Sequence, residues 1–175
     1  MSHCGYIQTF VRTELVSCIE RCTVQHGFGV TIEFKTEGRP LFVSNVHLAP
    51  YKQNADKRLQ MAQQLKSFAE GGDLIVLGDT NMRRSEESSW REHLTLSFDE
   101  TPPVTWDSYR NRFHGPGAFS FRCSFSRCLH SAGIHTQNIG ALKEACSVGS
   151  NSFFISDHFA LHGTFVTSAS LPHDS

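Results

Sequence analysis

Apolar and polar residues begin to alternate at residues 28–36 (FGVTIEFKT), which is typical of a strand with one buried face. A turn sequence, Gly38-Arg39-Pro40, separates this stretch from a more apolar one at 41–48 (LFVSNVHL). Two such stretches joined by a short turn predict an antiparallel hairpin. Before the hairpin, residues 5–15 (GYIQTFVRTEL) are interpreted as an earlier strand.

A helical period follows between Asn54 and Glu70. Apolar residues recur there at steps of three and four, with charged and amide side chains between them, as on an amphipathic helix: Leu59, Ala62, Leu65 and Ala69. We expect Asn54 to cap this helix and Gly71-Gly72 to end it. Residues 74–77 (LIVL) then form a short apolar run, which predicts a strand covered on both faces.

The second half of the chain is less regular. A short helix is expected around residues 88–96, and alternation at 120–129 (SFRCSFSRCL) predicts another strand. Residues 152–166 are interpreted as a strand interrupted by the polar triplet Ser156-Asp157-His158. The succession of strand, helix and buried strand predicts a layered α/β (α+β) sheet. The sequence shows no internal repeat, so we expect a single domain over residues 1–175, with a recognisable core at 28–166.

Length and composition restrict the class of protein. A chain of 175 residues with 39% hydrophobic and 19% charged residues can bury one core, and it is neither disordered nor membrane-spanning in composition. Its apolar runs are far shorter than the ~20 residues of a transmembrane helix. The N-terminal sequence also lacks the pattern of a secretory signal. We therefore expect a nuclear or cytoplasmic protein that is not secreted and has no membrane partner.

Charge and cysteines narrow the chemistry further. The net charge of −1 gives no overall basic field for nucleic acid. Four arginines nevertheless lie between Thr105 and His130 against one acid, Asp107, so this segment either meets a phosphate-bearing ligand or is a solvated loop: Arg110, Arg112, Arg122 and Arg127. The six cysteines form no CxxC pair and lack zinc-site spacing, which predicts reduced thiols rather than disulfides or structural zinc.

Polar groups stand at the ends of three hydrophobic strands. Asp79 and Asn81 follow the LIVL run, His47 lies near the end of the 41–48 stretch, and Asp157 and His158 interrupt the last strand. Each has an ordinary alternative, because Asp and Asn favour turns and a lone histidine can be a paired core residue. Burying three such groups costs a few kcal/mol each unless they are paired. Their positions therefore favour a shared site at one edge of the sheet.

These motifs, NVHL, GDTN and SDHF in this order, resemble those of the endonuclease/exonuclease/phosphatase superfamily of metal-dependent phosphoesterases. The sequences LIVLGDTNMR and VTWDS (residues 104–108) are similar to the tyrosyl-DNA phosphodiesterase branch, whose members release tyrosine from DNA 5′ ends. The resemblance implies a DNase I-like fold, a four-layer α/β/β/α sandwich, with Mg²⁺, or alternatively Mn²⁺, bound at one edge. It also implies nucleic acid, namely DNA ends with a 5′-phosphotyrosyl group, as the partner.

The resemblance assigns roles to individual residues. Asp79 would orient or deprotonate the attacking water, and Asn81 would fix that carboxylate and contact the phosphate. His47 and His158 would donate to phosphate oxygens, while Asp157, together with Asp79, would hold the metal. Trp106 and the arginines near it, Arg127 among them, would line the substrate channel, although core packing is the alternative for Trp106.

The sequence also departs from the family pattern. The family's earlier half supplies an Asn near its first strand and a metal-binding Glu, and neither is found here, so we expect a partial sandwich whose N-terminal portion is missing and one of whose sheet faces is left uncovered. Ser126 stands where the tyrosyl-DNA enzymes have an Asp that pairs with the SDH imidazole. A serine hydroxyl stabilises an imidazolium less well than a carboxylate does.

Three functions remain open at this point. The leading one is a Mg²⁺-dependent phosphodiesterase acting on nucleic-acid ends. A second is another phosphoesterase branch, of the inositol-phosphate or sphingomyelin type. A third is a catalytically silent fragment that binds nucleic acid or a protein partner, which the missing Glu and Ser126 favour.

Overall fold

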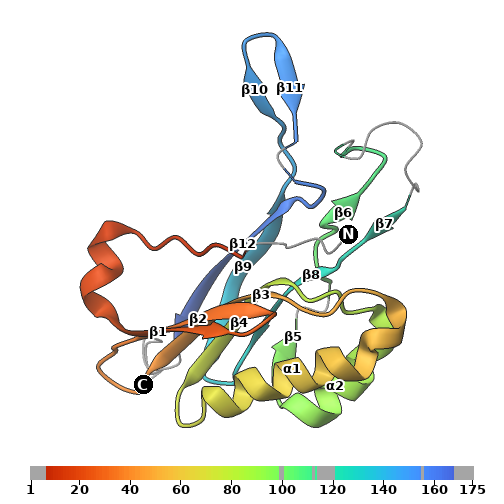
Figure 1. Cartoon of the computed structure of the whole chain (residues 1–175). Helices are drawn as coiled ribbons and strands as arrows, with labels where there is room; N and C mark the ends of the chain where they lie inside the picture. The colour runs from red at the N-terminus through yellow and green to blue at the C-terminus, as the bar shows by residue number, and fades with distance from the viewer. Residues whose placement is uncertain (1–6, 99–100, 112, 114–120, 155, 168–175) are drawn as a thin grey trace, which may run out of the picture.

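The central element of the fold is a six-stranded mixed sheet. A computed structural model describes residues 7–98, 101–111, 113, 121–154 and 156–167. The sheet has the order β1 (Ile19–Gln25), β2 (Gly29–Phe34), β3 (Leu41–His47), β4 (Asp73–Asp79), β8 (Ser126–His130) and β5 (Ser97–Phe98). The neighbours β3 and β4 are parallel, and every other pair in this sheet is antiparallel. Figure 1 shows β3 and β4 side by side at its centre.

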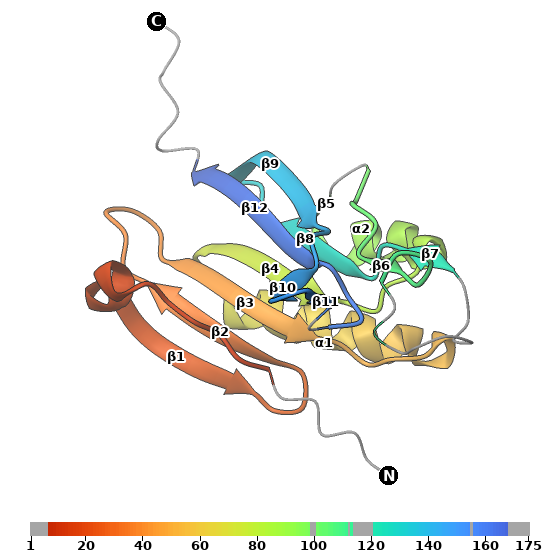
Figure 2. The same cartoon turned by 90° about the horizontal axis from the view of Figure 1, so that it is seen from above.

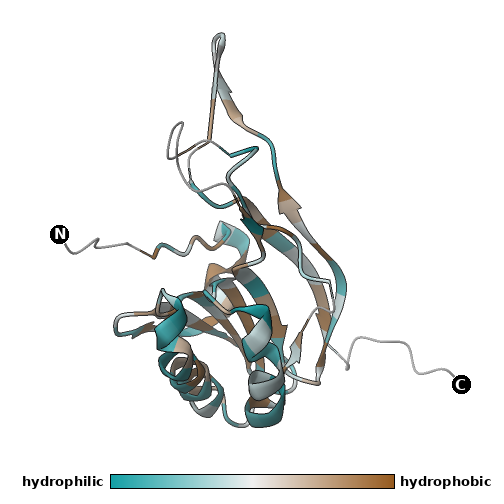
Figure 3. Ribbon diagram, turned by 90° about the vertical axis from the view of Figure 1, so that its right-hand side faces the viewer, coloured by the Kyte–Doolittle hydropathy of each residue, from teal (hydrophilic) through white to brown (hydrophobic). Residues whose placement is uncertain are grey.

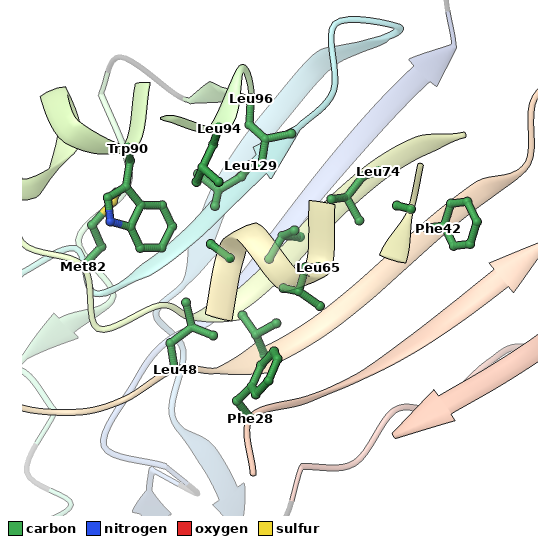
Figure 4. Packing of buried hydrophobic residues seen from close by; sticks show 14 residues of the cluster. Phe28, Phe42, Leu48, Leu65, Leu74, Met82, Trp90, Leu94, Leu96 and Leu129 are labelled. Carbon is green, nitrogen blue, oxygen red and sulfur yellow. The ribbon is translucent and has the colours of Figure 1, made fainter. Parts of the chain in front are cut away.

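Two helices cover one face of this sheet. These are α1 (Ala55–Phe68) and α2 (Glu87–Leu94). The described chain also has three 3-10 helices, which directly precede β1, α1 and α2: η1 (Thr13–Cys18), η2 (Lys52–Asn54) and η3 (Arg84–Glu86). Side chains from alternate positions of β3 and β4, such as Phe42 and Leu74, belong to one buried cluster with Leu65 and Trp90 of the helices (Figure 4). In Figure 3 the inner strands are largely brown and the helices largely teal. This layer therefore holds the main core.

Three two-stranded pairs complete the described chain. They are β6 (Trp106–Asp107) with β7 (Arg122–Cys123), β10 (Cys146–Val148) with β11 (Asn151–Phe153), and β9 (Ile134–Leu142) with β12 (Ala160–Thr167). The β9–β12 pair lies over the second face of the sheet, where Ile134 packs with Ile75 and Cys128. The β10–β11 hairpin projects away from both sheets (Figures 1 and 3), and Figure 2 shows the β9–β12 pair beside the large sheet from above. The described layers are thus helices, a six-stranded sheet and a two-stranded sheet.

The second face of the large sheet is only partly covered. The β9–β12 pair packs on β4 and β8, whereas Val24 on β1 is 60% exposed. Residues near the N-terminus lie along β3, because the Asn45 side chain donates to the Gln8 carbonyl at 2.9 Å. The expectation of a partial sandwich with an incompletely covered face agrees with this arrangement.

Several sequence predictions are confirmed. The 28–48 hairpin is β2 and β3, the 54–70 helix is α1, the buried strand is β4, and the 88–96 helix is α2. The 120–129 strand is divided into β7 and β8, and the last strand is indeed interrupted at Ser156-Asp157-His158. Asn54 is the N-cap residue of α1, but its side chain bonds the Pro50 carbonyl instead of capping the helix.

Two predictions about strands are wrong or incomplete. Residues 7–12 form no regular element and 13–18 form a 3-10 helix, so the expected strand at 5–15 does not exist within its described part. The first strand is β1, which the sequence reading missed, as it missed β9. All five cysteines in the described ranges are free thiols, as expected, and none of the helices in those ranges is long and apolar enough to cross a membrane.

Gly78 permits the close approach of β3 and β4 at the end of the pair. Its φ is +131°, and a Cβ atom there would lie 2.2 Å from the Val46 carbonyl oxygen. Glycine is therefore required on two counts, for its backbone conformation and for the space that it leaves.

We predict that Gly78→Ala lowers the free energy of unfolding by more than ~2 kcal/mol, because both backbone strain and a clash with β3 are introduced. Chemical denaturation measures this. Gly38→Ala is the matched control, because nothing lies within 4 Å of a Cβ added there. Equal effects of the two substitutions would contradict the assignment.

Candidate active site

The parallel pairing of β3 and β4 places His47 directly opposite Asp79, the last residues of the two strands. The His47 Nε2 atom lies 3.6 Å from Asp79 Oδ2, which is an ion-pair distance when the ring is protonated. Asp79 has a side chain only 21% exposed, whereas that of His47 is 49% exposed. A half-solvated imidazole therefore faces a largely buried carboxylate at the sheet edge.

His158 joins this pair from a different part of the chain. It lies in the loop between β11 and β12, and its Nε2 atom is also 3.6 Å from Asp79 Oδ2. Its other ring nitrogen, Nδ1, is 3.1 Å from the hydroxyl of Ser126, which is paired with Asp79 across β8 and β4. One carboxylate oxygen thus lies between two imidazoles.

Two hydrogen bonds fix the loop that carries His158. The Phe159 N–H donates to the Thr105 carbonyl at 2.7 Å, and the Asn111 side chain donates to the Ser156 carbonyl at 2.8 Å. Within the loop the His158 N–H donates to the Ser156 hydroxyl at 3.1 Å. The serine of the SDH motif therefore shapes the turn, while the histidine faces Asp79.

Asp79 and Asn81 form a turn, and Asp79 also contributes its carboxylate to the candidate site. The Asn81 N–H donates to Asp79 Oδ1 at 2.9 Å, and Asn81 has a φ of +51°, in the left-handed region that Asn tolerates. The Asn81 side-chain amide donates to the Leu48 carbonyl at 3.0 Å. The turn interpretation and the site interpretation are thus compatible, because Oδ1 holds the turn while Oδ2 faces the histidines. The backbone of Asn81, and not its amide, contacts the Asp79 carboxylate.

A buried arginine on α1 connects the loops that follow β3 and β4. Arg58 on α1 is fully buried and donates to the Ala49 and Tyr51 carbonyls at 2.7 Å each. It also makes a two-pronged ion pair with Glu86, with N···O distances of 2.6 and 3.0 Å. The sequence analysis missed Arg58, although it shares the core-facing stripe of the helix with Ala62 and Leu65. A charged residue on an apolar stripe is the signal that could have identified it.

Trp106 is half-buried and lies beside His158. Its ring is stacked on Phe121, with centroids 5.4 Å apart, and meets the His158 ring edge-on at 5.1 Å. Phe125 completes this group at 6.4 Å from both rings. The structure thus places Trp106 beside the candidate site, where its ring is also part of an aromatic packing group.

Arg127 is directed away from Asp79. Side chains of Ser126 and Arg127 alternate across β8, so Ser126 faces the histidines while Arg127 faces the α2 side. Its side chain is 7% exposed and pairs with Glu87 at 3.0 Å. Arg83, which the sequence analysis did not single out, lies nearer the site. It donates to the Asn81 carbonyl, and its guanidinium lies 5.3 Å from the Phe125 ring centroid.

The residues of the site do not provide a full set of ligands for a divalent cation. Within the described ranges, no group of three or more His, Cys, Asp or Glu side chains could hold a metal ion. Magnesium prefers oxygen ligands in octahedral geometry. Asp79 supplies a carboxylate whose two oxygens are already engaged, and Asp157 contacts the Ser156 hydroxyl at 3.4 Å. The fit to Mg²⁺ is therefore incomplete, and no step is assigned to the metal.

The class of fold follows from comparison of this architecture with solved structures. No protein-family model matches the sequence, and no curated protein sequence is significantly similar to it. Among solved structures, the chain is similar to an endonuclease/exonuclease/phosphatase family protein from Bacteroides thetaiotaomicron, with a TM-score of 0.56 and 16% identity over 79% of this chain and 54% of that one. The mannosyl-6-phosphatase Bt3783 of the same organism gives 0.56 and 19% over 79% and 56%. The chain has the DNase I-like fold of these proteins.

A particular protein on this fold is more similar. The structure of D. rerio TDP2 complexed with a single-strand DNA product gives a TM-score of 0.63 and 21% identity, over 83% of this chain and 64% of that chain. The present chain thus spans less than two thirds of the length of each of these structures. The likeness to the superfamily expected from the motifs is confirmed at the level of the fold.

Asp107 stabilises the turn that presents Trp106. Burial by itself would raise the pKa of its carboxyl group, but the hydrogen bond from Arg122 and those from the Arg110 and Tyr109 N–H groups outweigh it, so its pKa lies below the ordinary value. A depressed folded-state pKa stabilises the fold above the unfolded-state pKa of about 4, and this contribution is lost as the pH falls through the folded-state value.

We predict that Asp107→Asn lowers the free energy of unfolding by ~1–2 kcal/mol at pH 7 and that its difference from the wild type vanishes well below pH 4. Urea denaturation at a series of pH values measures both effects. A difference that stays constant down to low pH would show that packing, and not the carboxylate charge, is responsible.

Proposed function

We propose that this chain is a phosphodiesterase-type hydrolase acting on nucleic-acid ends, with a 5′-phosphotyrosyl DNA end as the first substrate to test. The observation that carries the proposal is the position of Asp79 Oδ2, 3.6 Å from the Nε2 atoms of both His47 and His158. The likeness of the fold to D. rerio TDP2, whose structure holds a single-strand DNA product, supports a nucleic-acid substrate.

The proposed chemistry follows from these three side chains. Asp79 accepts a proton from the attacking water, because it is the carboxylate of the cluster. His47 and His158 donate to non-bridging phosphate oxygens, where they stabilise the negative charge of the transition state. Asn81 contributes through its backbone, which holds the Asp79 carboxylate in place. Its side-chain amide, which donates one hydrogen to the Leu48 carbonyl, is our candidate for a phosphate contact through its other hydrogen. Trp106, beside His158, would take a base or the tyrosine ring.

The cofactor of the reaction is also a proposal. Mg²⁺, with Mn²⁺ as the substitute, would neutralise phosphate charge when bound near Asp79 and Asp157. Because these residues do not complete a metal site within the described part of the chain, further oxygen ligands must come from elsewhere, such as water and the substrate phosphate.

A catalytically silent, nucleic-acid-binding fragment is the second candidate. The incomplete metal ligands and Ser126 beside His158 favour it, because the hydroxyl stabilises a charged imidazole less than a carboxylate would. A phosphomonoesterase activity such as the one named for Bt3783 is a further branch of the same fold.

We predict that the chain releases tyrosine from a 5′-phosphotyrosyl oligonucleotide in the presence of Mg²⁺ and that Asp79→Asn lowers turnover roughly 10²–10⁴-fold. Asparagine retains an Oδ1 acceptor for the Asn81 N–H, so the turn survives while the proton acceptor is lost. EDTA is expected to remove activity, and added Mg²⁺ or Mn²⁺ to restore it. A rate unaffected by both Asp79→Asn and EDTA would contradict the proposal, while no turnover by the wild type would favour the silent candidate.

We further predict that Ser126→Asp raises kcat at least about tenfold, a gain of ~1.4 kcal/mol in transition-state stabilisation. The new carboxylate would lie against His158 Nδ1, which is 3.1 Å from the present hydroxyl, and would stabilise the protonated ring. Ser126→Ala serves as the matched control and is expected to lower kcat. Steady-state kinetics with the same oligonucleotide measures both, and equal rates for all three proteins would exclude a role for this contact.

A further inference from the structure

A second, arginine-lined pocket adjoins the candidate active site. It has a volume of about 490 Å³, and among the described residues it is lined by four arginines and one acid, Glu87: Arg83, Arg84, Arg122 and Arg127. Phe125 also lines it, and the Phe125 ring is 6.4 Å from that of His158. Phe125 therefore lies between this pocket and the His158 ring of the candidate site.

The positive charge of this pocket is balanced only in part, although Arg122 pairs at 2.9 Å with Asp107, which lies outside the lining. Arg127 has a side chain only 7% exposed, and Glu87 is its ion-pair partner at 3.0 Å, while its Nε atom has no hydrogen-bond partner within the described ranges. Burial, together with repulsion from Arg84, lowers the pKa of Arg127. Cys123 in the same lining does not compensate, because burial and the charge of Asp79 raise its pKa to about 12 and keep it a neutral thiol.

Arginines in such a cluster match a phosphate group. The guanidinium is a planar fork of donors that binds phosphate oxygens in pairs, and it does so most strongly where water is excluded. The helix α2 begins at Glu87 in the pocket wall, and the positive end of its dipole also favours an anion. A buried cation that lacks full compensation in the free protein would gain a partner when phosphate binds.

We propose that this pocket binds a phosphate of the nucleic-acid strand whose reacting end lies at Asp79. The inference rests on the proposed function for the identity of the ligand, but the pocket itself is independent of the catalytic groups. Arg83 connects the pocket with the candidate site, because it lines the pocket, donates to the Asn81 carbonyl and stacks over Phe125. A strand that enters past Phe125 would place one phosphate at the histidines and a neighbouring one among the arginines.

The test uses Arg84→Gln, because Arg84 is exposed and its substitution leaves the buried Arg127–Glu87 pair in place. Binding of a fluorescently labelled single-stranded oligonucleotide with a 5′-phosphate is measured by anisotropy at several salt concentrations. The variant is expected to bind several-fold more weakly, with a slope of log K against log salt that is shallower by about 0.7. Arg91→Gln on the neighbouring helix α2 is the matched control, because Arg91 stacks on Phe98 and is not part of the pocket lining.

Glu87→Gln gives a prediction of the opposite sign. It removes the one acid among the described lining residues, so the oligonucleotide should bind more tightly to the variant than to the wild type. Non-specific attraction to the surface would make Arg84→Gln and Arg91→Gln equally weak, and that result would overturn the proposal. Unchanged binding by both Arg84→Gln and Glu87→Gln would overturn it as well.

A measurement with inorganic phosphate distinguishes failure of the pocket proposal from failure of the proposed function. Phosphate alone is expected to shift the Arg127 Nε–Hε resonance in ¹H–¹⁵N spectra of the full chain, and Arg84→Gln is expected to weaken the effect. If phosphate binds at this pocket but the oligonucleotide does not bind, the proposal that the ligand is a nucleic-acid strand is wrong. If neither binds, the pocket is not an anion site at all. Loss of hydrolysis in Asp79→Asn with intact Arg84-dependent binding would support both proposals separately.

Discussion

The site depends on the parallel pairing of two strands that end at the same edge of the sheet. The two strands pair residue for residue, from Leu41 with Asp73 to His47 with Asp79, so the imidazole and the carboxylate are direct neighbours across the sheet. A one-residue slip of β3 would turn His47 to the helix side and expose the apolar side chains that now pack there. The register is therefore determined by core burial, and the geometry of the site follows from it. Gly78 allows the last pairs to close, because any side chain there would strike the Val46 carbonyl.

Arg58 plays a comparable part for the loops that follow the two strands. Through four hydrogen bonds it links the carbonyls after β3 to Glu86, which lies beyond the GDTN turn. A buried ion pair of this kind adds little to stability when compared with apolar packing, but losing one partner leaves the other charge and two carbonyls without compensation. Its effect is to specify where the loops lie. Asn81, whose amide bonds Leu48 in the same region, then reinforces the position of the turn.

Much of the fold and of the site could be predicted from the sequence, because the decisive signals are local. The hairpin, α1 and β4 have clear periodicity, and strand ends with polar residues indicate a shared edge. β9 was missed because its exposed and partly buried residues, which include His135, Gln137 and Asn138, follow no period of two, and its partner β12 comes about twenty residues later. Its pairing depends on distant contacts that a local pattern does not record. The prediction for residues 5–15 failed for a different reason. The described part of this segment contacts β3 through the Asn45 side chain but does not pair with it as a strand, and Phe10 remains 88% exposed.

The two histidines of the site differ in how they are held. His47 belongs to a central strand with neighbours on both sides, and its own N–H bonds the Phe28 carbonyl, so it shares the stability of the main core. His158 precedes β12, in a two-stranded sheet that contacts the rest through a small apolar cluster, and sheets of this size are only marginally stable by themselves. Fluctuations that lift the smaller sheet would carry one imidazole away and leave the other in place. The two imidazoles beside this carboxylate thus differ in the stability of the elements that carry them.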